Sequence, residues 1–483
     1  MYNSPRYSRP TALSLVLLFA VLLAFRLYGI TNSPFERGDY WRQPDTESVA
    51  INFVRYDHNP LRPNFNYDGP LPNVVALELQ ITTAIIALLY SLFGRLYWLA
   101  RLVPIGFFLG SCWYLYLWGR RHLGHWAALW ATAFYGVVPV NLYYSRAIMP
   151  ESAALFFTAG ALWYFQCFTE TGREQNRWLL LSGLFLLLAG TQKPQTLLVA
   201  LPMLGLLWVR YRGPGFLADI RLWAFAASVL GLTYVYYWYS NSVAEFRFVH
   251  GITTKHVLAY FSTAIFHPLA RQFFRQYGLE SFGWIALVVM VVALLVFQRR
   301  LWLTYLWLVG TAVNLAVVVA VVRLPYYLMY IVAPLALVVG AFLDRFRGRL
   351  ATVPLLLLVA IAVQSWWIVH TKYLELPETL GTARAVQMAV PEDDLILTPV
   401  ISPVVINACD RRGWRFNISY YPDVPEDPIE ELHYYIHRGA KWFVTWAGVI
   451  QNDPDGRIRR YLDEHYERLE PVPGYPIYRL RGD

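Results

Sequence analysis

The sequence predicts a mostly α-helical protein that crosses a membrane many times and ends in a small α/β domain. The 483 residues are 57% hydrophobic and only 15% charged, with a mean hydropathy of +0.36. A soluble chain of this length does not normally tolerate such an apolar composition. Apolar runs of about 17 to 25 residues, the length that a membrane-spanning helix needs, recur through the first three quarters of the chain.

The first apolar run, residues 11–30, predicts an uncleaved transmembrane helix, because it contains Arg26 and no small-residue cleavage site follows it. Further candidate spans begin near Val74, Trp98, Trp126, Ser152, Trp178, Gln195, Leu222, Phe282, Leu301, Tyr326 and Ala351. The run from Val74 to Phe93 contains Glu78, and we expect it to lie at the membrane surface as an amphipathic helix. About eleven transmembrane helices then remain.

Basic residues predict the orientation, because short cytoplasmic loops collect Lys and Arg. They flank the predicted spans at Arg6, Arg9, Arg120, Arg121, Arg173, Arg177, Arg210, Arg212, Arg299, Arg300, Arg345, Arg347 and Arg349. All of them fall inside the cell if the N-terminus is cytoplasmic and residues 31–97 form one large external loop with membrane-surface helices. These loop cations also explain the net charge of +9, which therefore does not indicate a nucleic-acid partner.

The end of the chain has a different pattern. Strand-like runs at 395–398 and 442–446 alternate with helix-like runs at 429–437 and 458–466. We therefore predict a transmembrane domain over residues 1–371 and an extracytoplasmic α/β domain over residues 372–483. The second domain could handle an acceptor or cover the mouth of a cavity, and a purely structural role fits its sequence equally well.

Acidic residues from separate segments reach the predicted outer side. They are Asp45 in the first external loop, Asp68 in the same loop, and Glu151 at the start of a span. Because Glu151 follows Pro150, it also fits the ordinary pattern of a helix N-terminus. Carboxylates that gather on one side of a membrane protein indicate a functional site there.

Single basic residues occupy the short connections on the same predicted side: Arg146, Lys193 and Arg323. Cations at the outer ends of apolar helices are what a lipid phosphate in the outer leaflet needs. The alternative is that their side chains snorkel to the interface, which requires no ligand. Lys193 is the favoured phosphate ligand, because Pro194 breaks the helix beside it.

Aromatic and histidine residues leave two questions open. Sugar rings could stack on Tyr40, Trp41, Tyr67, Tyr143, Tyr144, Tyr326 and Tyr327, but Tyr and Trp gather at every membrane interface. His250, His256 and His267 follow Ser240 in an external stretch and are the candidate ligands of a divalent metal. Their spacing matches no zinc pattern, so the sequence does not decide whether a metal binds.

Several of these segments together resemble a known superfamily. Residues 41–46 (WRQPDT), followed by Asn52 and Phe53, are similar to the first external loop of bacterial relatives of the protein O-mannosyltransferases. Pro44 and Asp45 also resemble the corresponding loop of the lipid A aminoarabinose transferases. Both groups belong to the GT-C superfamily of polytopic glycosyltransferases.

The resemblance extends over most of the membrane part. It continues through Asp68-Gly69-Pro70, Phe93-Gly94, Arg101-Leu102, Gly119-Arg120-Arg121, Tyr144-Ser145-Arg146, Met149-Pro150-Glu151, Gln192-Lys193-Pro194, Tyr326-Tyr327 and Pro334-Leu335-Ala336. One departure concerns the paired tyrosines. Many relatives carry a His just ahead of them, whereas this chain has Arg323, Leu324 and Pro325.

The resemblance implies a GT-C fold and a polyprenyl-phosphate-dependent glycosyltransferase. A sugar would pass, with inversion, from an undecaprenyl- or dolichyl-phosphate carrier to a hydroxyl of a protein, lipid or glycan. Asp45 would be the general base, because an acceptor hydroxyl is a weak nucleophile until a carboxylate takes its proton. The reaction requires no cofactor, and the sequence leaves undecided whether a divalent metal takes part. It would occur on the outer face of a bacterial or archaeal plasma membrane.

The resemblance also assigns the other site residues. Glu151 and Asp68 would assist Asp45 by orienting the sugar or acceptor, or by holding a cation. Lys193, Arg146 and Arg323 would stabilise the phosphate leaving group. Trp41, Arg42, Tyr326 and Tyr327 would line the substrate site.

A flippase or transporter of lipid-linked sugars is the alternative function. It would need the same spans, cavity and cations, but no catalysis. Transporters often have two similar halves, with charged groups near the bilayer midplane. This sequence shows no internal repeat, and its acids cluster on one side, so a transferase is the favoured interpretation.

Overall fold

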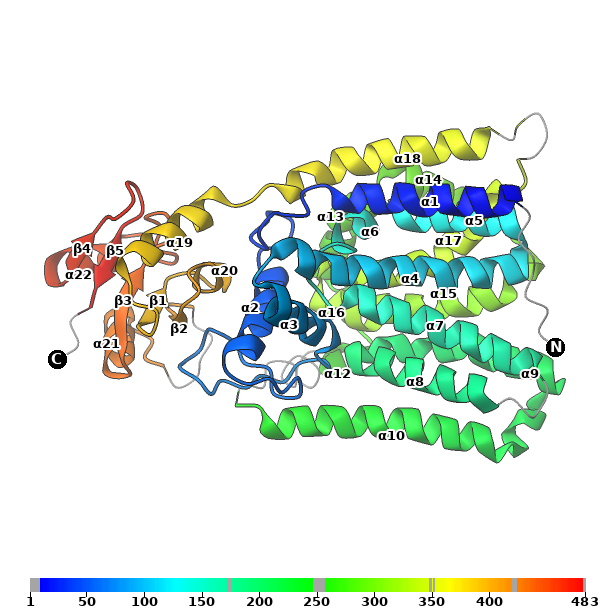
Figure 1. The fold of residues 1–483 in the computed structure, drawn as a ribbon, viewed down its shortest axis with the longest axis horizontal. Helices are drawn as coiled ribbons and strands as arrows, with labels where there is room; N and C mark the ends of the chain where they lie inside the picture. Colours follow the sequence, from blue (N-terminus) through cyan, green and yellow to red (C-terminus); the bar gives the residue numbers. More distant parts are fainter. Residues whose placement is uncertain are drawn as a thin grey trace.

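The computed structural model describes residues 9–171, 176–245, 257–346, 350, 352–418 and 424–480. The chain is mostly helical, with one five-stranded sheet near its C-terminal end. Figure 1 shows long helices packed side by side in a bundle, the sheet domain at the opposite end, and the short helices α2 and α3 between them. The predicted fold class, mostly helical with a small α/β domain, is confirmed at this level.

The bundle consists of helices that coincide with the predicted apolar runs. They are α1 (Arg9–Leu27), α4 (Tyr97–Leu123), α5 (His125–Val137), α7 (Glu151–Glu170), α8 (Asn176–Gln192), α9 (Ala200–Tyr211), α10 (Ile220–Val243), α14 (Trp284–Leu295), α15 (Trp302–Asn314), α17 (Met329–Leu343) and α18 (Val353–Val369). In the described ranges, four helical segments are long and apolar enough to cross a membrane: Tyr97–Leu123, Arg299–Val322, Pro325–Leu343 and Val353–Tyr373. The bent pair of α13 (Pro268–Phe282) and α14 raises this number to five. A total of about eleven spans stays a prediction.

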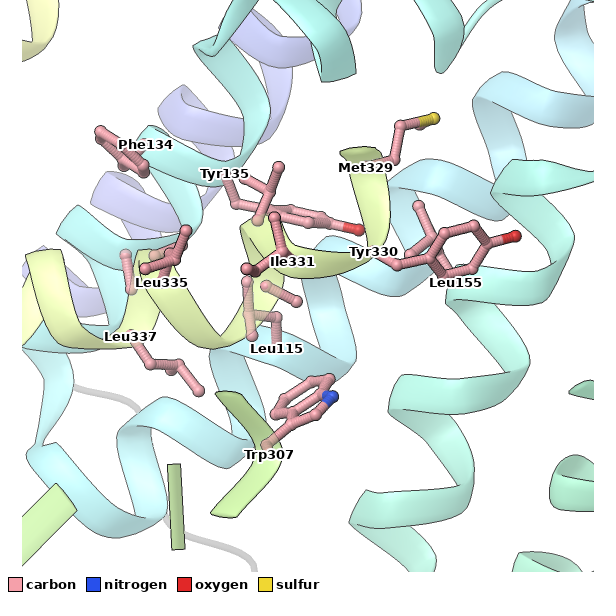
Figure 2. Close-up of a cluster of buried hydrophobic side chains, with 14 of the residues drawn as sticks. Leu115, Phe134, Tyr135, Leu155, Trp307, Met329, Tyr330, Ile331, Leu335 and Leu337 are labelled. Atoms are coloured by element: carbon pink, nitrogen blue, oxygen red, sulfur yellow. The ribbon is translucent and has the colours of Figure 1, made fainter. Parts of the chain in front are cut away.

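Helix α17 lies at the centre of the bundle and is buried along nearly its whole length. Figure 2 shows Met329, Tyr330, Ile331, Leu335 and Leu337 of α17 among side chains from α4, α5, α7 and α15. Gly340 permits the close contact with α5, since a Cβ atom there would lie 2.3 Å from the carbonyl oxygen of Ala127. This tight packing gives the short helices at the end of the bundle a rigid support.

Short elements occupy the end of the bundle that faces the sheet domain (Figure 1). They include α2 (Arg42–Arg55), α3 (Ile81–Phe93), α6 (Pro139–Tyr144), α12 (Leu258–Tyr260), α16 (Ala320–Val322) and the 3-10 helices η1 (Pro194–Val199) and η7 (Pro325–Leu328). Helix α3 begins seven residues after Val74, later than the apolar run predicted. The residues before it are extended, because Glu78 pairs with Arg42 and the backbone N–H of Leu79 donates to the carbonyl oxygen of Thr191.

The C-terminal domain is a five-stranded sheet with helices around it. Its elements are α19 (Pro377–Ala389), β1 (Leu395–Thr398), α20 (Val404–Ala408), β2 (Arg412–Arg415), α21 (Pro428–His437), β3 (Ala440–Val444), α22 (Arg457–His465), β4 (Glu467–Leu469) and β5 (Ile477–Arg479). The strand order is β2-β1-β3-β5-β4, with β1 parallel to β2 and β3, and β5 antiparallel to β3 and β4. Each of the predicted strands and helices of this domain overlaps an observed element.

The C-terminal domain and the first loop share one hydrophobic core. Val49, Ala50 and Phe53 of α2 are buried in the same cluster as Val404 and Val405 of α20. The boundary predicted at residue 371 therefore separates two parts of the chain whose side chains pack into one core. This shared core brings residues of the C-terminal domain next to the predicted site.

Candidate functional site

A cavity of about 900 Å³ lies where the first loop, the C-terminal domain and the end of the bundle meet. Its polar wall comprises Asp39, Trp41, Arg42, Asp45, Tyr67 and Arg415. Its apolar wall includes Leu77, Ala264, Leu269, Val321, Val322 and Leu324, and Arg323 and Tyr326 also line it. A space of this size, polar on one side and apolar on the other, can accept a sugar together with part of a lipid chain.

Asp45 lies in the first turn of α2 and is almost fully buried in the polar wall. The hydroxyl of Tyr67 donates to Asp45 Oδ2 at 3.1 Å, and Asn407 Nδ2 donates to Oδ1 at 2.9 Å. Burial raises the pKa of Asp45 to about 7, while Arg42, both hydrogen bonds and Arg415 act in the opposite direction. A carboxyl group with this pKa can take a proton from a substrate near neutral pH.

Asp39 is a second carboxylate of the polar wall, and the sequence interpretation missed it. Its Oδ1 accepts the backbone N–H groups of Trp41 and Arg42, at 3.1 and 2.7 Å, at the start of α2. Burial raises the pKa of Asp39 to about 6. An Asp three residues before a helix is a capping pattern, so this part of its role could have been found from the sequence.

A buried ionic network lies behind the polar wall. Arg42 pairs with Glu78, and Lys193 Nζ lies 3.9 Å from Glu78 Oε2. Lys193 Nζ is also 3.1 Å from Glu151 Oε1, within ion-pair distance but not aligned as a hydrogen bond. Pro194 ends α8 at this point, which turns Lys193 toward Glu151. The structure thus brings Asp45, Lys193 and Glu151 to the same end of the bundle, with Lys193 one layer behind the cavity lining.

Asp68 forms an ion pair with Arg415, at 3.1 Å between Oδ2 and Nη2. Burial raises the pKa of Asp68 to about 6, while Arg415 acts in the opposite direction. The Arg415 guanidinium also lies 4.5 Å from the ring centre of Tyr67. Asp68 therefore holds Arg415 in the cavity wall, and its role toward a substrate stays a prediction.

Arg323 and Tyr326 also line the cavity, and the Tyr327 ring packs against Tyr326. Arg323 ends α16 in a left-handed backbone conformation, with φ of 52°. Within the described ranges its side chain has no ion pair or hydrogen bond, so its charge is available to a ligand. Tyr326 lines the cavity beside it, and the Tyr327 ring centre lies 5.3 Å from Lys193 Nζ.

Arg146 occupies a different environment from the one that the sequence suggested. It is fully buried, 2.9 Å from Glu36 Oε1, and donates to the carbonyl oxygen of Gly29 at 2.7 Å. Arg101 shares Glu36, at 3.1 Å. Arg146 is absent from the cavity lining found in the described part of the chain. This geometry favours a structural ion pair over phosphate binding.

Of the three candidate metal ligands, His267 is the one that lies in the described residues. His267 lines the cavity, and its Nδ1 accepts the backbone N–H of Leu269 at 3.2 Å. His250 and His256 lie outside the described residues. Among the residues that the structure describes, no group of three or more His, Cys, Asp or Glu side chains could hold a metal ion.

Parts of the chain are similar in sequence to known glycosyltransferases. The sequence model of the dolichyl-phosphate-mannose-protein mannosyltransferase family matches residues 81–240. Dolichyl-phosphooligosaccharide-protein glycotransferase 1 of Pyrococcus furiosus is 30% identical over 192 residues, which are 38% of this chain and 19% of that protein. The chain thus spans about a fifth of the length of this curated relative.

Solved structures match over nearly the whole chain. ArnT from Cupriavidus metallidurans bound to undecaprenyl phosphate has a TM-score of 0.68 at 13% identity, with 96% of this chain and 97% of that chain covered. The Archaeoglobus fulgidus oligosaccharyltransferase has a TM-score of 0.55 at 12% identity, with 89% and 67% covered. Mycobacterial arabinofuranosyltransferase AftD has a TM-score of 0.57 at 14% identity, with 99% and 40% covered. The implied GT-C fold is therefore confirmed.

Proposed function

Because this chain has the fold of the GT-C superfamily of membrane glycosyltransferases, we propose that it transfers a sugar from a polyprenyl-phosphate carrier to an acceptor hydroxyl. The reaction takes place in the cavity between the bundle and the C-terminal domain, on the outer side of a bacterial or archaeal plasma membrane. The observation that carries this proposal is the position of Asp45. A buried carboxylate of raised pKa lines the cavity, and so does Arg323, whose side chain has no ion pair with the residues that the structure describes.

Asp45 acts as the general base in this proposal. The acceptor hydroxyl gives its proton to the carboxylate while its oxygen bonds to the anomeric carbon. The bond between that carbon and the phosphate oxygen breaks at the same time, and the lipid phosphate leaves with the electron pair. A single displacement of this kind inverts the anomeric carbon. Asp45 then returns the proton to solvent.

Arg323 and the apolar wall hold the donor. The developing charge on the leaving phosphate needs a cation within the site, and Arg323 is available, whereas Arg42 and Lys193 already face Glu78 and Glu151. Val322 and Leu324 flank Arg323 and offer apolar contacts to a prenyl chain. The undecaprenyl phosphate named for the ArnT structure supports a donor of this class.

Lys193 supports this phosphate site from behind the cavity wall. Its charge offsets the buried carboxylates of Glu151 and Glu78. Trp41 and Tyr326 supply flat aromatic surfaces on which a sugar ring can pack.

The test compares envelope glycans and lipids, by mass spectrometry, from cells that lack this protein and from cells complemented with wild type or Asp45→Asn. We expect one sugar-modified product to disappear in the deletion strain, to return with wild type, and to stay absent with Asp45→Asn. Equal product with the Asp45→Asn variant at the same protein level would reject the proposal. If cells that lack this protein lose translocation of a lipid-linked sugar but their open vesicles still transfer the sugar, the result would instead support a flippase.

A further inference from the structure

Asn407 of helix α20 extends from the C-terminal domain to Asp45. It is 2% exposed, and its Nδ2 donates to Asp45 Oδ1 at 2.9 Å across 362 positions of sequence. The opposite orientation of the amide would place two oxygen atoms against each other, so the donor orientation is the stable one. Asn407 Oδ1 has no hydrogen-bond partner among the described residues, which leaves the contact with Asp45 as the main polar interaction of this side chain.

The C-terminal domain also fixes the second donor to Asp45. The backbone N–H of Gly413 in β2 donates to the carbonyl oxygen of Asn66 at 3.1 Å, and the N–H of Gly69 donates to the carbonyl oxygen of Gly413 at 3.0 Å. Tyr67, which donates to Asp45 Oδ2, lies between these two bonds. The edge of the sheet thus holds the loop that presents Tyr67.

Ion pairs attach α20 to the helix that carries Asp45. Asp410, just after α20, lies 2.9 Å from Arg55 at the end of α2 and 3.1 Å from Arg95. Arg95 also lies 2.8 Å from Glu47, two residues after Asp45. These contacts fix the position of α20 relative to α2, and therefore the separation of Asn407 from the carboxylate.

We propose that the C-terminal domain completes the active site, with Asn407 as a positioning residue that orients the Asp45 carboxylate and keeps it ready to accept a proton. The inference rests on the proposed function only in the identity of Asp45 as the base. The charged and titratable groups that face Asp45 are Arg42 from α2, Tyr67 from the first loop and Arg415 from β2. Asn407 is a neutral donor to Asp45 and does not titrate, so its removal changes no charge.

The test measures the ionisation of Asp45 without any substrate. The apparent melting temperature of the full-length protein in detergent is followed from pH 4.5 to pH 9 for two pairs: wild type with Asp45→Asn, and Asn407→Leu with Asn407→Leu/Asp45→Asn. Asn407→Leu removes the donor and keeps the same branched side-chain shape. Ser402→Ala is the matched control. The Ser402 hydroxyl donates to the carbonyl oxygen of Tyr40 and accepts the backbone N–H of Val404, and in the described ranges it forms no hydrogen bond with Asp45.

The direction in which stability changes with pH follows from the raised pKa of Asp45. Above the pKa of an unfolded Asp, the folded chain binds more protons than the unfolded chain, so wild type loses stability relative to Asp45→Asn as the pH rises, until the folded pKa near 7 is passed. We call the pH at which this stability difference stops changing the levelling point. Without Asn407 the charged form of Asp45 loses a donor, so the pKa of Asp45 rises and the levelling point moves up by about one pH unit. With Ser402→Ala it does not move.

A levelling point at the same pH with and without Asn407 would overturn the inference, even if Asp45→Asn abolishes sugar transfer. A shifted levelling point in a protein that transfers no sugar would support the inference about the contact and reject the proposed function. If Asn407→Leu does not fold, Asn407→Ala serves the same purpose. It also removes the donor without adding a charge, and we expect a shift in the same direction.

Discussion

Replacing Asp45 by Asn tests the proposed base with little change in shape. The Asn amide can still accept from Tyr67 through its oxygen, so we expect the first loop to keep its structure. The variant lacks the proton acceptor of the reaction. General-base catalysis contributes about 10²- to 10⁴-fold to a rate. We therefore expect kcat/KM to fall by about three orders of magnitude.

The pH dependence of kcat/KM in wild type tests Asp45 in a second way. With a pKa of about 7, Asp45 is ionised to about one tenth at pH 6 and about nine tenths at pH 8. Only the ionised form accepts a proton, so kcat/KM rises about tenfold over this range. The assay follows the release of polyprenyl phosphate from a purified donor in proteoliposomes, at fixed ionic strength.

Asp39 provides the matched control for this profile. It lines the same cavity, and burial raises its pKa to about 6, but it caps α2 through backbone N–H groups. Asp39→Asn keeps an oxygen for this cap, and we expect the midpoint of the rise in kcat/KM with pH to remain near pH 7. A flat profile, a midpoint that follows Asp39, or an Asp45→Asn variant within about twofold of wild type would refute the assignment.

Further predictions concern the cations. Arg323→Met raises KM for the polyprenyl-phosphate donor at least tenfold, measured by initial rates, while the melting temperature stays within a few degrees, because Arg323 has no carboxylate partner in the described ranges. Lys193→Met lowers the melting temperature, since it leaves Glu151 buried without its cation, and adding Glu151→Gln restores part of the loss. Arg146→Met costs about 3 kcal/mol of stability through Glu36, measured by chemical unfolding, and any residual folded protein keeps a normal donor KM.

Much of the helical architecture could be predicted because it depends on local sequence. Apolar runs of helical length coincide with helices of the bundle, and α17 is hydrophobic around its whole circumference because other helices surround it. Helix α3 begins later than its apolar run, because Glu78 is drawn into the buried network around Arg42. A long-range ion pair of this kind leaves no mark in local hydropathy.

The site was predictable to the extent that its residues belong to short motifs. Asp45, Lys193 and Glu151 were singled out from neighbouring residues such as Pro44 and Pro194, and the fold brings them to one end of the bundle. Arg146 also lies in such a motif, but its partner Glu36 is 110 positions away, so its burial could not be seen from the sequence.

Apart from Asp39 of the first loop, the residues that the sequence interpretation missed come from the C-terminal domain. Asn407 and Arg415 reach Asp45 and Asp68 across about 350 residues, through the pairing of β2 with the first loop. Neither residue stands in a recognisable motif. Tertiary structure alone places them in the cavity.

The central claim is that the cavity performs an inverting displacement on a polyprenyl-phosphate sugar with Asp45 as the base. The most direct measurement is the anomeric configuration of the product, determined by NMR from a donor of known configuration, with polyprenyl phosphate release followed by mass spectrometry. We expect an inverted product from wild type and release about a thousandfold slower from Asp45→Asn. A product with retained configuration, or release of polyprenyl phosphate by the Asp45→Asn variant at the wild-type rate, would contradict this account.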